Sequence, residues 1–218
     1  MCGISASFDI RKLKDLMEVN NARGQFSFSL TIIDPLTNQI VGQHKGFVDN
    51  RSHILNYYKT LNDNRLYYIS HSQAPTSDTG LSMRFDRVHP ASFRRSHLYH
   101  NGIIKDFGID MLQKTAMDYI DTWDTSLLLK CISKTNLDIL NYLSGSFACL
   151  LIDSDGIFTF RNKSSILYYD DDLNISSSNF NGEMTELDSN QVFKLDLESS
   201  RLIKQYQFNS PDNNYAFV

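Results

Sequence analysis

The sequence predicts an α+β fold in which antiparallel sheets carry helices on their faces. Two hairpin-rich halves flank a central helical part, and this order is typical of antiparallel sheets with segregated helices. Apolar residues make up 41% of the 218 residues, which is enough for a sizeable core. The length suits a single domain over residues 1–218.

The first half alternates short strands with amphipathic helices. Phe26, Phe28, Leu30 and Ile32 alternate with hydroxyl residues, which indicates a half-buried strand. A turn around Pro35 returns it as a hairpin. We therefore expect strands over 2–9, 26–32, 39–45 and 66–70, a helix over 11–20, and a helix over 51–61 with Ile54, Tyr57, Tyr58 and Leu61 on its inner face.

A long polar stretch, residues 71–95, separates the two halves, and a connection of this length is usually functional. Apolar periodicity after it predicts helices, and residues 145 onward change to strands and turns. We expect a strand that includes 98–100 and ends at Asn101-Gly102, helices over 109–112, 125–133 and 137–143, a hairpin of 147–153 with 157–161, and strands over 166–169, 174–178, 191–197 and 202–208.

Charge and composition exclude several classes of function. The net charge of −4 leaves no basic surface for nucleic acid or an anionic membrane. No segment reaches transmembrane length, and the first residues do not resemble a signal peptide, so we expect a cytoplasmic protein. Three sparse cysteines, Cys2, Cys131 and Cys149, predict neither a disulfide framework nor a zinc site, and no cofactor is expected.

Cys2 is a candidate nucleophile because it becomes the first residue once Met1 is removed. The thiol and a free α-amine then share one residue, with reference pKa values of about 8.5 and about 8. The amine can act as general base for its own side chain. A small residue opening a strand is the alternative interpretation.

Asn101 and Gly102 are candidates for the oxyanion site that a thiol amidase requires. The asparagine amide and a glycine backbone N–H are two suitable donors, and glycine allows a substrate to approach the backbone closely. The same dipeptide is also a common hairpin turn.

Several short motifs occur in a characteristic order along the chain. Together they resemble the glutaminase domain of class II glutamine amidotransferases over nearly the whole length. The matching segments are Met1-Cys2-Gly3-Ile4, Arg23-Gly24-Gln25-Phe26-Ser27, His71-Ser72-Gln73-Ala74-Pro75-Thr76, His89-Pro90, His100-Asn101-Gly102-Ile103-Ile104, Asp121-Thr122-Trp123-Asp124-Thr125, Gly145-Ser146-Phe147-Ala148 and Arg161-Asn162.

The resemblance implies a four-layer αββα sandwich of two antiparallel sheets, the N-terminal nucleophile hydrolase fold. It implies that Cys2 attacks the glutamine carboxamide while Asn101 and Gly102 hold the oxyanion. Asp124 would bind the substrate's α-ammonium, although an aspartate there could equally cap a helix. Thr76 would contact the glutamine from its loop, or be an ordinary loop hydroxyl.

Gln73 departs from the family pattern, which has an arginine here to clamp the α-carboxylate of glutamine. A guanidinium offers a charged bidentate pair, whereas an amide offers one neutral donor group. The change predicts roughly tenfold weaker substrate binding or more. A charge could come from elsewhere, and the sequence does not distinguish among Arg84, Arg87, Arg94 and Arg95.

The leading hypothesis is a glutamine amidohydrolase or amidotransferase subunit that acts through a Cys2 thioester. The single domain leaves no room for an acceptor or synthase domain, so ammonia is released or passed to a separate synthase or ligase. Two alternatives stay open. One is an amidohydrolase acting on an amide without a free α-carboxylate, and the other is a catalytically silent regulatory or binding subunit.

Overall fold

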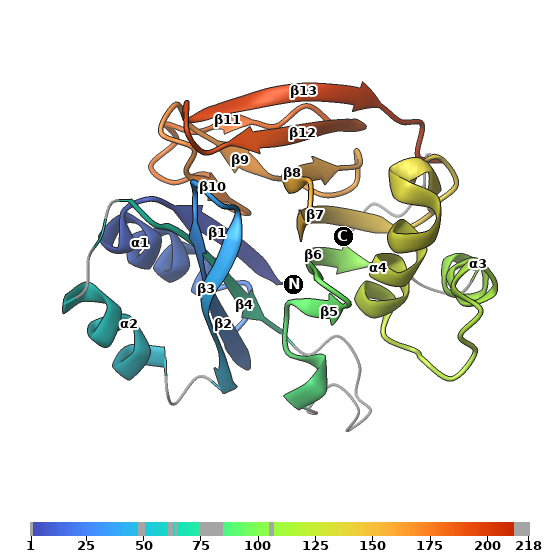
Figure 1. Cartoon of the computed structure of the whole chain (residues 1–218), viewed down its shortest axis with the longest axis horizontal. Helices are drawn as coiled ribbons and strands as arrows, with labels where there is room; N and C mark the ends of the chain where they lie inside the picture. Colours follow the sequence, from blue (N-terminus) through green and yellow to red (C-terminus); the bar gives the residue numbers. More distant parts are fainter. Residues whose placement is uncertain are drawn as a thin grey trace.

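Two antiparallel sheets, with helices on their outer faces, make up the chain (Figure 1). The computed structural model describes residues 2–47, 51–60, 63, 65–74, 85–104 and 107–211. The seven-stranded sheet has the order β11-β9-β10-β1-β4-β2-β3, and the six-stranded sheet has the order β13-β12-β8-β7-β6-β5.

The seven-stranded sheet combines the first half of the chain with three short strands from the second half. Its central strands pair in the order β1, β4, β2, with Ser5 opposite Ser70 and Leu30 opposite Ser70 on the other side. The elements of the first half are β1 (Gly3–Ser7), α1 (Ile10–Asn21), β2 (Ser27–Asp34), β3 (Gln39–Phe47), α2 (Arg51–Thr60) and β4 (Tyr67–Gln73).

The six-stranded sheet is formed by the second half, and α3 and α4 lie on its side of the molecule (Figure 1). The remaining elements are the 3₁₀ turn η3 (Phe85–Arg87), β5 (Ala91–Phe93), β6 (Ser96–Ile103), α3 (Phe107–Ala116), α4 (Asp124–Thr135), η4 (Asn136–Asn141), β7 (Ser146–Asp153), β8 (Gly156–Arg161), β9 (Tyr168–Tyr169), β10 (Ile175–Ser176), β11 (Thr185–Glu186), β12 (Gln191–Asp196) and β13 (Arg201–Gln207).

Three apolar clusters separate four layers. The first packs α1 onto the seven-stranded sheet through Leu13, Met17 and Leu30. The second fills the space between the sheets and includes Ile4 and Tyr99. The third lies between the six-stranded sheet and α4. The predicted four-layer αββα sandwich is confirmed.

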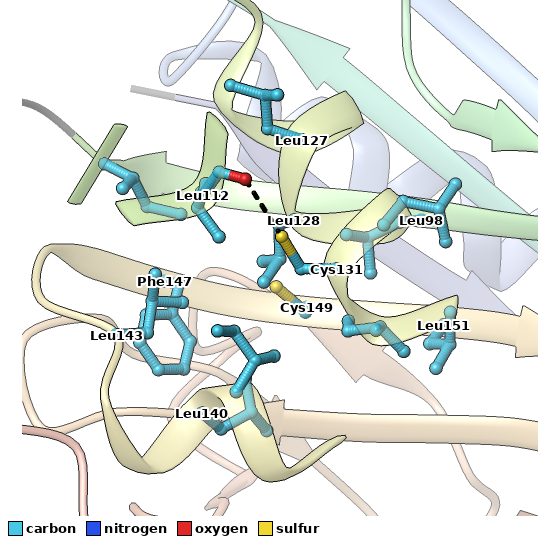
Figure 2. Packing of buried hydrophobic residues seen from close by; sticks show 14 of the residues in the cluster. Leu98, Leu112, Leu127, Leu128, Cys131, Leu140, Leu143, Phe147, Cys149 and Leu151 are labelled. Atoms are coloured by element: carbon cyan, nitrogen blue, oxygen red, sulfur yellow. Dashed lines mark hydrogen bonds between the residues drawn. The ribbon is translucent and has the colours of Figure 1, made fainter. Parts of the chain in front are cut away.

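Strand β7 is buried on both faces, which explains its continuous apolar sequence. Phe147, Cys149 and Leu151 face the cluster beneath α4, whereas Ala148 and Leu150 face the other sheet. Successive side chains point to opposite faces of a strand, so a strand buried on both faces has no polar positions. Figure 2 shows this packing, with Cys131 of α4 donating to the carbonyl oxygen of Leu112 at 3.3 Å.

The structure also corrects the sequence-based elements. Tyr57 was expected on the inner face of its helix, but its side chain is 61% exposed. Tyr58 and Leu61 lie outside the residues whose side chains the structure describes. The short strands β5 and β11 were not predicted, because two or three residues carry no periodicity. Within the described ranges, no helix is long and apolar enough to cross a membrane.

Candidate active site

Cys2 lies directly before β1 and is 5% exposed. Its thiol points toward the carbonyl oxygen of Ala74, with Sγ and O 3.8 Å apart. Ala74 follows the last residue of β4, the strand that pairs with β1. The candidate nucleophile is therefore held where two neighbouring strands reach the same edge of the sheet.

Arg23 and Gly24 fix the backbone on the other side of Cys2. The Nε atom of Arg23 donates to the carbonyl oxygen of Cys2 at 3.0 Å. A Cβ atom on Gly24 would lie 2.5 Å from the carbonyl carbon of Gln73, so only glycine fits against the end of β4. Arg23 and Gly24, which belong to one of the segments that resemble the family, thus support the nucleophile directly.

Ser177 joins the nucleophile's strand to Asn101. Its hydroxyl oxygen accepts from the backbone N–H of Ile4 at 2.9 Å and from Nδ2 of Asn101 at 3.2 Å. Ile4 is two residues beyond Cys2, so the hydroxyl links the two sheets beside the thiol. Ser177 was not predicted, because a serine in the run 176–178 carries no distinguishing signal.

Asn101 and Gly102 lie inside β6 and do not form the hairpin turn that the dipeptide can also indicate. Asn101 is opposite Ala148, and Gly102 is opposite Phe147 in β7. Gly102 has φ of +152°, and a Cβ atom there would lie 1.9 Å from the carbonyl oxygen of Ser146. Packing against β7 is sufficient by itself to require glycine at this position.

Arg161 stabilises the segment that supports Asn101. Its guanidinium is buried and donates to the carbonyl oxygens of Leu187 at 2.5 Å and Ser165 at 2.9 Å. The Ser165 hydroxyl in turn donates to the carbonyl oxygen of Asn101 at 3.4 Å. Arg161 therefore supports Asn101 indirectly, through hydrogen bonds that include Ser165.

Asp124 is the first residue of α4, and the N-cap is Trp123, which makes no side-chain cap bond. The Asp124 carboxylate accepts from the backbone N–H of Ile104 at 3.0 Å and from that of Thr125 at 2.7 Å. His100 Nδ1 lies 3.7 Å from Oδ2. The carboxylate thus connects the start of α4 to the end of β6, on the side where Asn101 lies.

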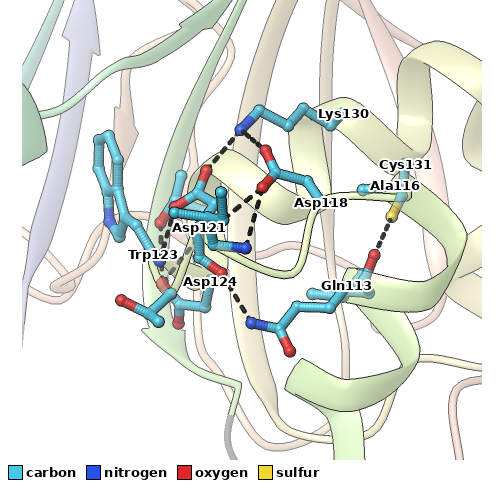
Figure 3. A network of polar contacts seen from close by, with 12 residues as sticks. Gln113, Ala116, Asp118, Asp121, Trp123, Asp124, Lys130 and Cys131 are labelled. Atoms are coloured by element: carbon cyan, nitrogen blue, oxygen red, sulfur yellow. Dashed lines mark hydrogen bonds and ion pairs between the residues drawn. The ribbon is translucent and has the colours of Figure 1, made fainter.

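The loop before Asp124 is held by two ion pairs to Lys130 of α4, as Figure 3 shows. Lys130 Nζ lies 2.8 Å from a carboxylate oxygen of Asp118 and 2.6 Å from one of Asp121. Gln113 Nε2 donates to the carbonyl oxygen of Asp121 at 2.8 Å. The entry to α4 is therefore a fixed segment.

Gln73, the predicted carboxylate-binding position, is 8% exposed and has both side-chain polar atoms engaged. Its Oε1 accepts from the Ser27 hydroxyl at 2.9 Å, and its Nε2 donates to the carbonyl oxygen of Arg87 at 3.1 Å. Thr76, the other predicted recognition residue, lies outside the described residues.

Burial is the main influence on the Cys2 thiol and raises its pKa. The negative charge of Asp124 raises this pKa further, whereas Arg23 lowers it. The thiol is therefore protonated near neutral pH, and an attack by Cys2 requires a base to remove its proton.

Two buried histidines lie beneath the segments that carry Gln73 and Asp124. The ring of His89 packs against His71 at 4.0 Å and against Trp123 at 5.3 Å between centroids. Burial lowers the pKa of His71 to about 3 and that of His89 well below its ordinary value. Both rings are neutral at physiological pH.

Two cavities differ in their relation to Cys2. A cavity of about 1180 Å³ lies at the other end of β1, where Ser7 and Asp9 line it. A second cavity of about 590 Å³ is lined by Arg87, Trp123 and Lys45 among others, and it lies beside the segment that enters α4. Within the described part of the chain, no three His, Cys, Asp or Glu residues gather in positions that could hold a metal ion.

The structure resembles known proteins in fold. It matches glutamine phosphoribosylpyrophosphate amidotransferase from B. subtilis with a TM-score of 0.67 and 15% identity, covering 94% of this chain and 49% of that one. It matches the allosteric regulatory enzyme of purine biosynthesis with a TM-score of 0.66 and 16% identity, covering 94% and 48%. This chain thus spans about half the length of each.

A predicted glutamine amidotransferase from Pseudomonas aeruginosa PA01 matches with a TM-score of 0.41 and 14% identity, covering 93% of this chain and 95% of that one. No protein-family model and no curated protein sequence matches the chain. The first two matches confirm, at the level of fold, the class II amidotransferase resemblance that the motifs predicted.

Proposed function

We propose that this chain hydrolyses the side-chain amide of glutamine to glutamate and ammonia through a thioester at Cys2. Removal of Met1 would supply the α-amine that serves as base. Two observations support the proposal. The fold matches about half of the length of a glutamine amidotransferase, and the candidate residues gather around Cys2.

The observation that carries the proposal is the bridge made by Ser177. One hydroxyl oxygen accepts from Ile4, two residues beyond Cys2, and from the side-chain amide of Asn101. A thiol amidase needs its nucleophile and its oxyanion donors at one place. Residues 99 positions apart in the sequence would meet that need here because Ser177 joins β1 of one sheet to β6 of the other.

In the first half of the proposed reaction, the α-amine accepts the thiol proton and sulfur attacks the carboxamide carbon. Asn101 Nδ2 and the Gly102 N–H then stabilise the oxyanion. The carbon–nitrogen bond breaks as the α-ammonium returns a proton to the leaving nitrogen. Ammonia leaves, and a glutamyl thioester remains on Cys2.

In the second half, the α-amine takes a proton from water, and the hydroxide attacks the thioester carbon. Collapse of the second oxyanion breaks the carbon–sulfur bond, and the thiolate is reprotonated. Asp124 would hold the α-ammonium of the substrate throughout, and Thr76 would contact the glutamine from its loop. We further propose that ammonia is released or passed to a separate acceptor protein.

A second candidate substrate is an amide without a free α-carboxylate. The observation favouring it is that the Gln73 side chain bonds Ser27 and Arg87 inside the protein. The position used by the family for carboxylate binding is thus occupied by internal contacts.

Ammonia release and intact mass test the proposal together. We expect a native protein lacking Met1, release of ammonia from glutamine, and one added label from diazo-oxo-norleucine, mapped to Cys2. Cys2→Ala should lose both turnover and label. Cys131→Ala is the matched control, since Cys131 is a buried thiol far along the chain, and it should keep both.

Equal ammonia release by the native protein and Cys2→Ala would refute a Cys2 thioester. Turnover of another amide without labelling by the glutamine analogue would favour the second substrate class. A retained Met1 with no turnover of either amide would identify a catalytically silent subunit.

A further inference from the structure

The internal contacts of Gln73 give this side chain a structural role. Its carboxamide donates to the main-chain carbonyl of Arg87 while accepting from Ser27. Gln73 therefore anchors a basic residue, Arg87, at the end of β4. The anchored residue carries the charge that Gln73 lacks.

Arg87 connects the end of β4 to the segment that enters α4. Its main chain is held by Gln73, and its Nη2 donates to the hydroxyl of Thr122 at 2.8 Å. The Arg87 side chain is only partly exposed. A guanidinium has five N–H donors, and the bond to Thr122 uses one of them.

Thr122 is a firm attachment point for this guanidinium. It lies next to Asp121, which is paired with Lys130, and the backbone N–H of Trp123 donates to Asp121 Oδ1 at 3.0 Å. The position of the guanidinium is thus set from α4, the helix that carries Asp124.

The Arg87 guanidinium contacts Thr122, and Asp124 follows Thr122 by two residues, so opposite charges are attached at the two ends of the segment 122–124. A free α-amino acid carries its ammonium and its carboxylate on the same α-carbon. A cation and an anion attached to one short segment therefore suit such a molecule, and an arginine fork suits a carboxylate. Arg87 and Asp124 would bind its two charged groups.

Of the other three arginines in residues 71–95, two are excluded as carboxylate ligands by their position, and one lies outside the described residues. Arg94 and Arg95 form the turn between β5 and β6. Ser96 and Asn101 are five residue steps apart along β6, a distance of about 17 Å, so this turn lies far from Asn101. Arg84 lies outside the described residues.

We propose that Arg87 binds the α-carboxylate of the substrate and that Gln73 positions it, which replaces the arginine expected at position 73. This inference rests on the proposed glutaminase function and specifies its substrate as a free α-amino acid. Arg87 thus determines specificity by binding the substrate, whereas Cys2 carries out the chemical step.

Calorimetric binding to the Cys2→Ala protein tests the inference without turnover. The probes are L-glutamine and its α-amide, L-glutaminamide, which lacks the carboxylate charge. We expect Arg87→Ala to weaken glutamine binding tenfold or more and glutaminamide binding less than twofold. Thr122→Ala, which keeps the charge, should weaken glutamine binding about threefold. Arg94→Ala, the matched control, should change neither affinity.

Equal losses for the two ligands, no loss for glutamine, or no binding of glutamine by Cys2→Ala would each overturn the inference. Circular dichroism establishes that Arg87→Ala is folded, and Thr122→Ala provides the test if it is not. Failure of the proposed function looks different: glutamine binds in an Arg87-dependent way, yet the protein with Cys2 intact releases no ammonia.

Discussion

The reaction end and the recognition end of the candidate site follow the family pattern to different degrees. At the reaction end, Cys2, Arg23, Asn101 and Gly102 stand at the positions that the motifs indicate, and hydrogen bonds hold the first three. At the recognition end, Gln73 replaces the expected arginine and its amide bonds the protein itself.

Geometry explains the difference. An oxyanion donor must lie within a few tenths of an ångström of its position, so backbone contacts such as the close approach of Gly102 to Ser146 restrict the sequence. A carboxylate needs a positive charge nearby, and that charge can be supplied from any adjacent segment. We therefore expect substitutions at the reaction end to change kcat, and those at the recognition end to change binding.

The largest effect is expected at Asn101. Replacing Asn101 by alanine removes one oxyanion donor and should lower kcat for glutamine about 10²- to 10³-fold, with little change in KM. Steady-state ammonia release measures both constants. Gly102→Ala is unsuitable as a companion, because its Cβ atom would collide with Ser146 and unfold β6. A KM effect alone at Asn101 would contradict its assignment to the reaction end.

A smaller effect is expected at Ser177, which positions Asn101 without contacting the substrate. Ser177→Ala removes the acceptor for Asn101 Nδ2 and should lower kcat about tenfold while KM changes less than twofold. Ser178→Ala is the neighbouring control and should have wild-type kinetics. An unchanged kcat in Ser177→Ala would show that Asn101 is oriented by other contacts.

The reactivity of Cys2 should respond in opposite directions to its two charged neighbours. Asp124→Asn removes a charge that raises the pKa of the thiol, so this pKa should fall, while Arg23→Met should raise it. Rates of alkylation by iodoacetamide between pH 7 and 10, mapped to Cys2, report both shifts. Asp110→Asn, an exposed carboxylate on α3, should have no effect. Shifts of the same sign would refute this electrostatic account.

The smallest effect on the reaction itself is expected from the two histidines beneath the recognition end, which act on stability. His71, with its pKa lowered to about 3, stays neutral in the folded protein, whereas the unfolded chain binds a proton below about pH 6.5. Stability is therefore complete above pH 6.5 and falls with pH below it. The free energy of unfolding should drop by about 1.4 kcal/mol per pH unit for this histidine, with a similar contribution from His89.

Urea denaturation at pH 7.5, 6.5 and 5.5 measures that slope, and His53→Gln, an exposed histidine on α2, should leave it unchanged. Proton NMR provides a second measurement, in which the His71 ring should not titrate above pH 5. A His71 ring that titrates near pH 6.5 would mean that this part of the site is open to water.

Local patterns were sufficient for much of the fold. The apolar period predicted the helix that forms α1, whose Leu13, Leu16 and Met17 are buried, and the hairpin predicted for 147–153 and 157–161 forms as β7 and β8. Tyr57 was placed wrongly because a helix at the edge of a sandwich buries less of its apolar side than its periodicity suggests. The strands β5 and β11 exist only through pairing with a neighbour.

By itself, the sequence determined the fold class and the candidate residues Cys2, Asn101, Gly102 and Asp124, since each belongs to a short motif whose chemistry depends on residue type and local order. Only the tertiary structure decided that Ser177 joins Asn101 to the strand of Cys2, and that Arg87 is anchored by Gln73 and Thr122. The physical reason is that these contacts join segments from different elements, and long-range pairing leaves no period or spacing in a single sequence. The assignment of the carboxylate-binding charge therefore depends on packing and could not be made from the residue at position 73 alone.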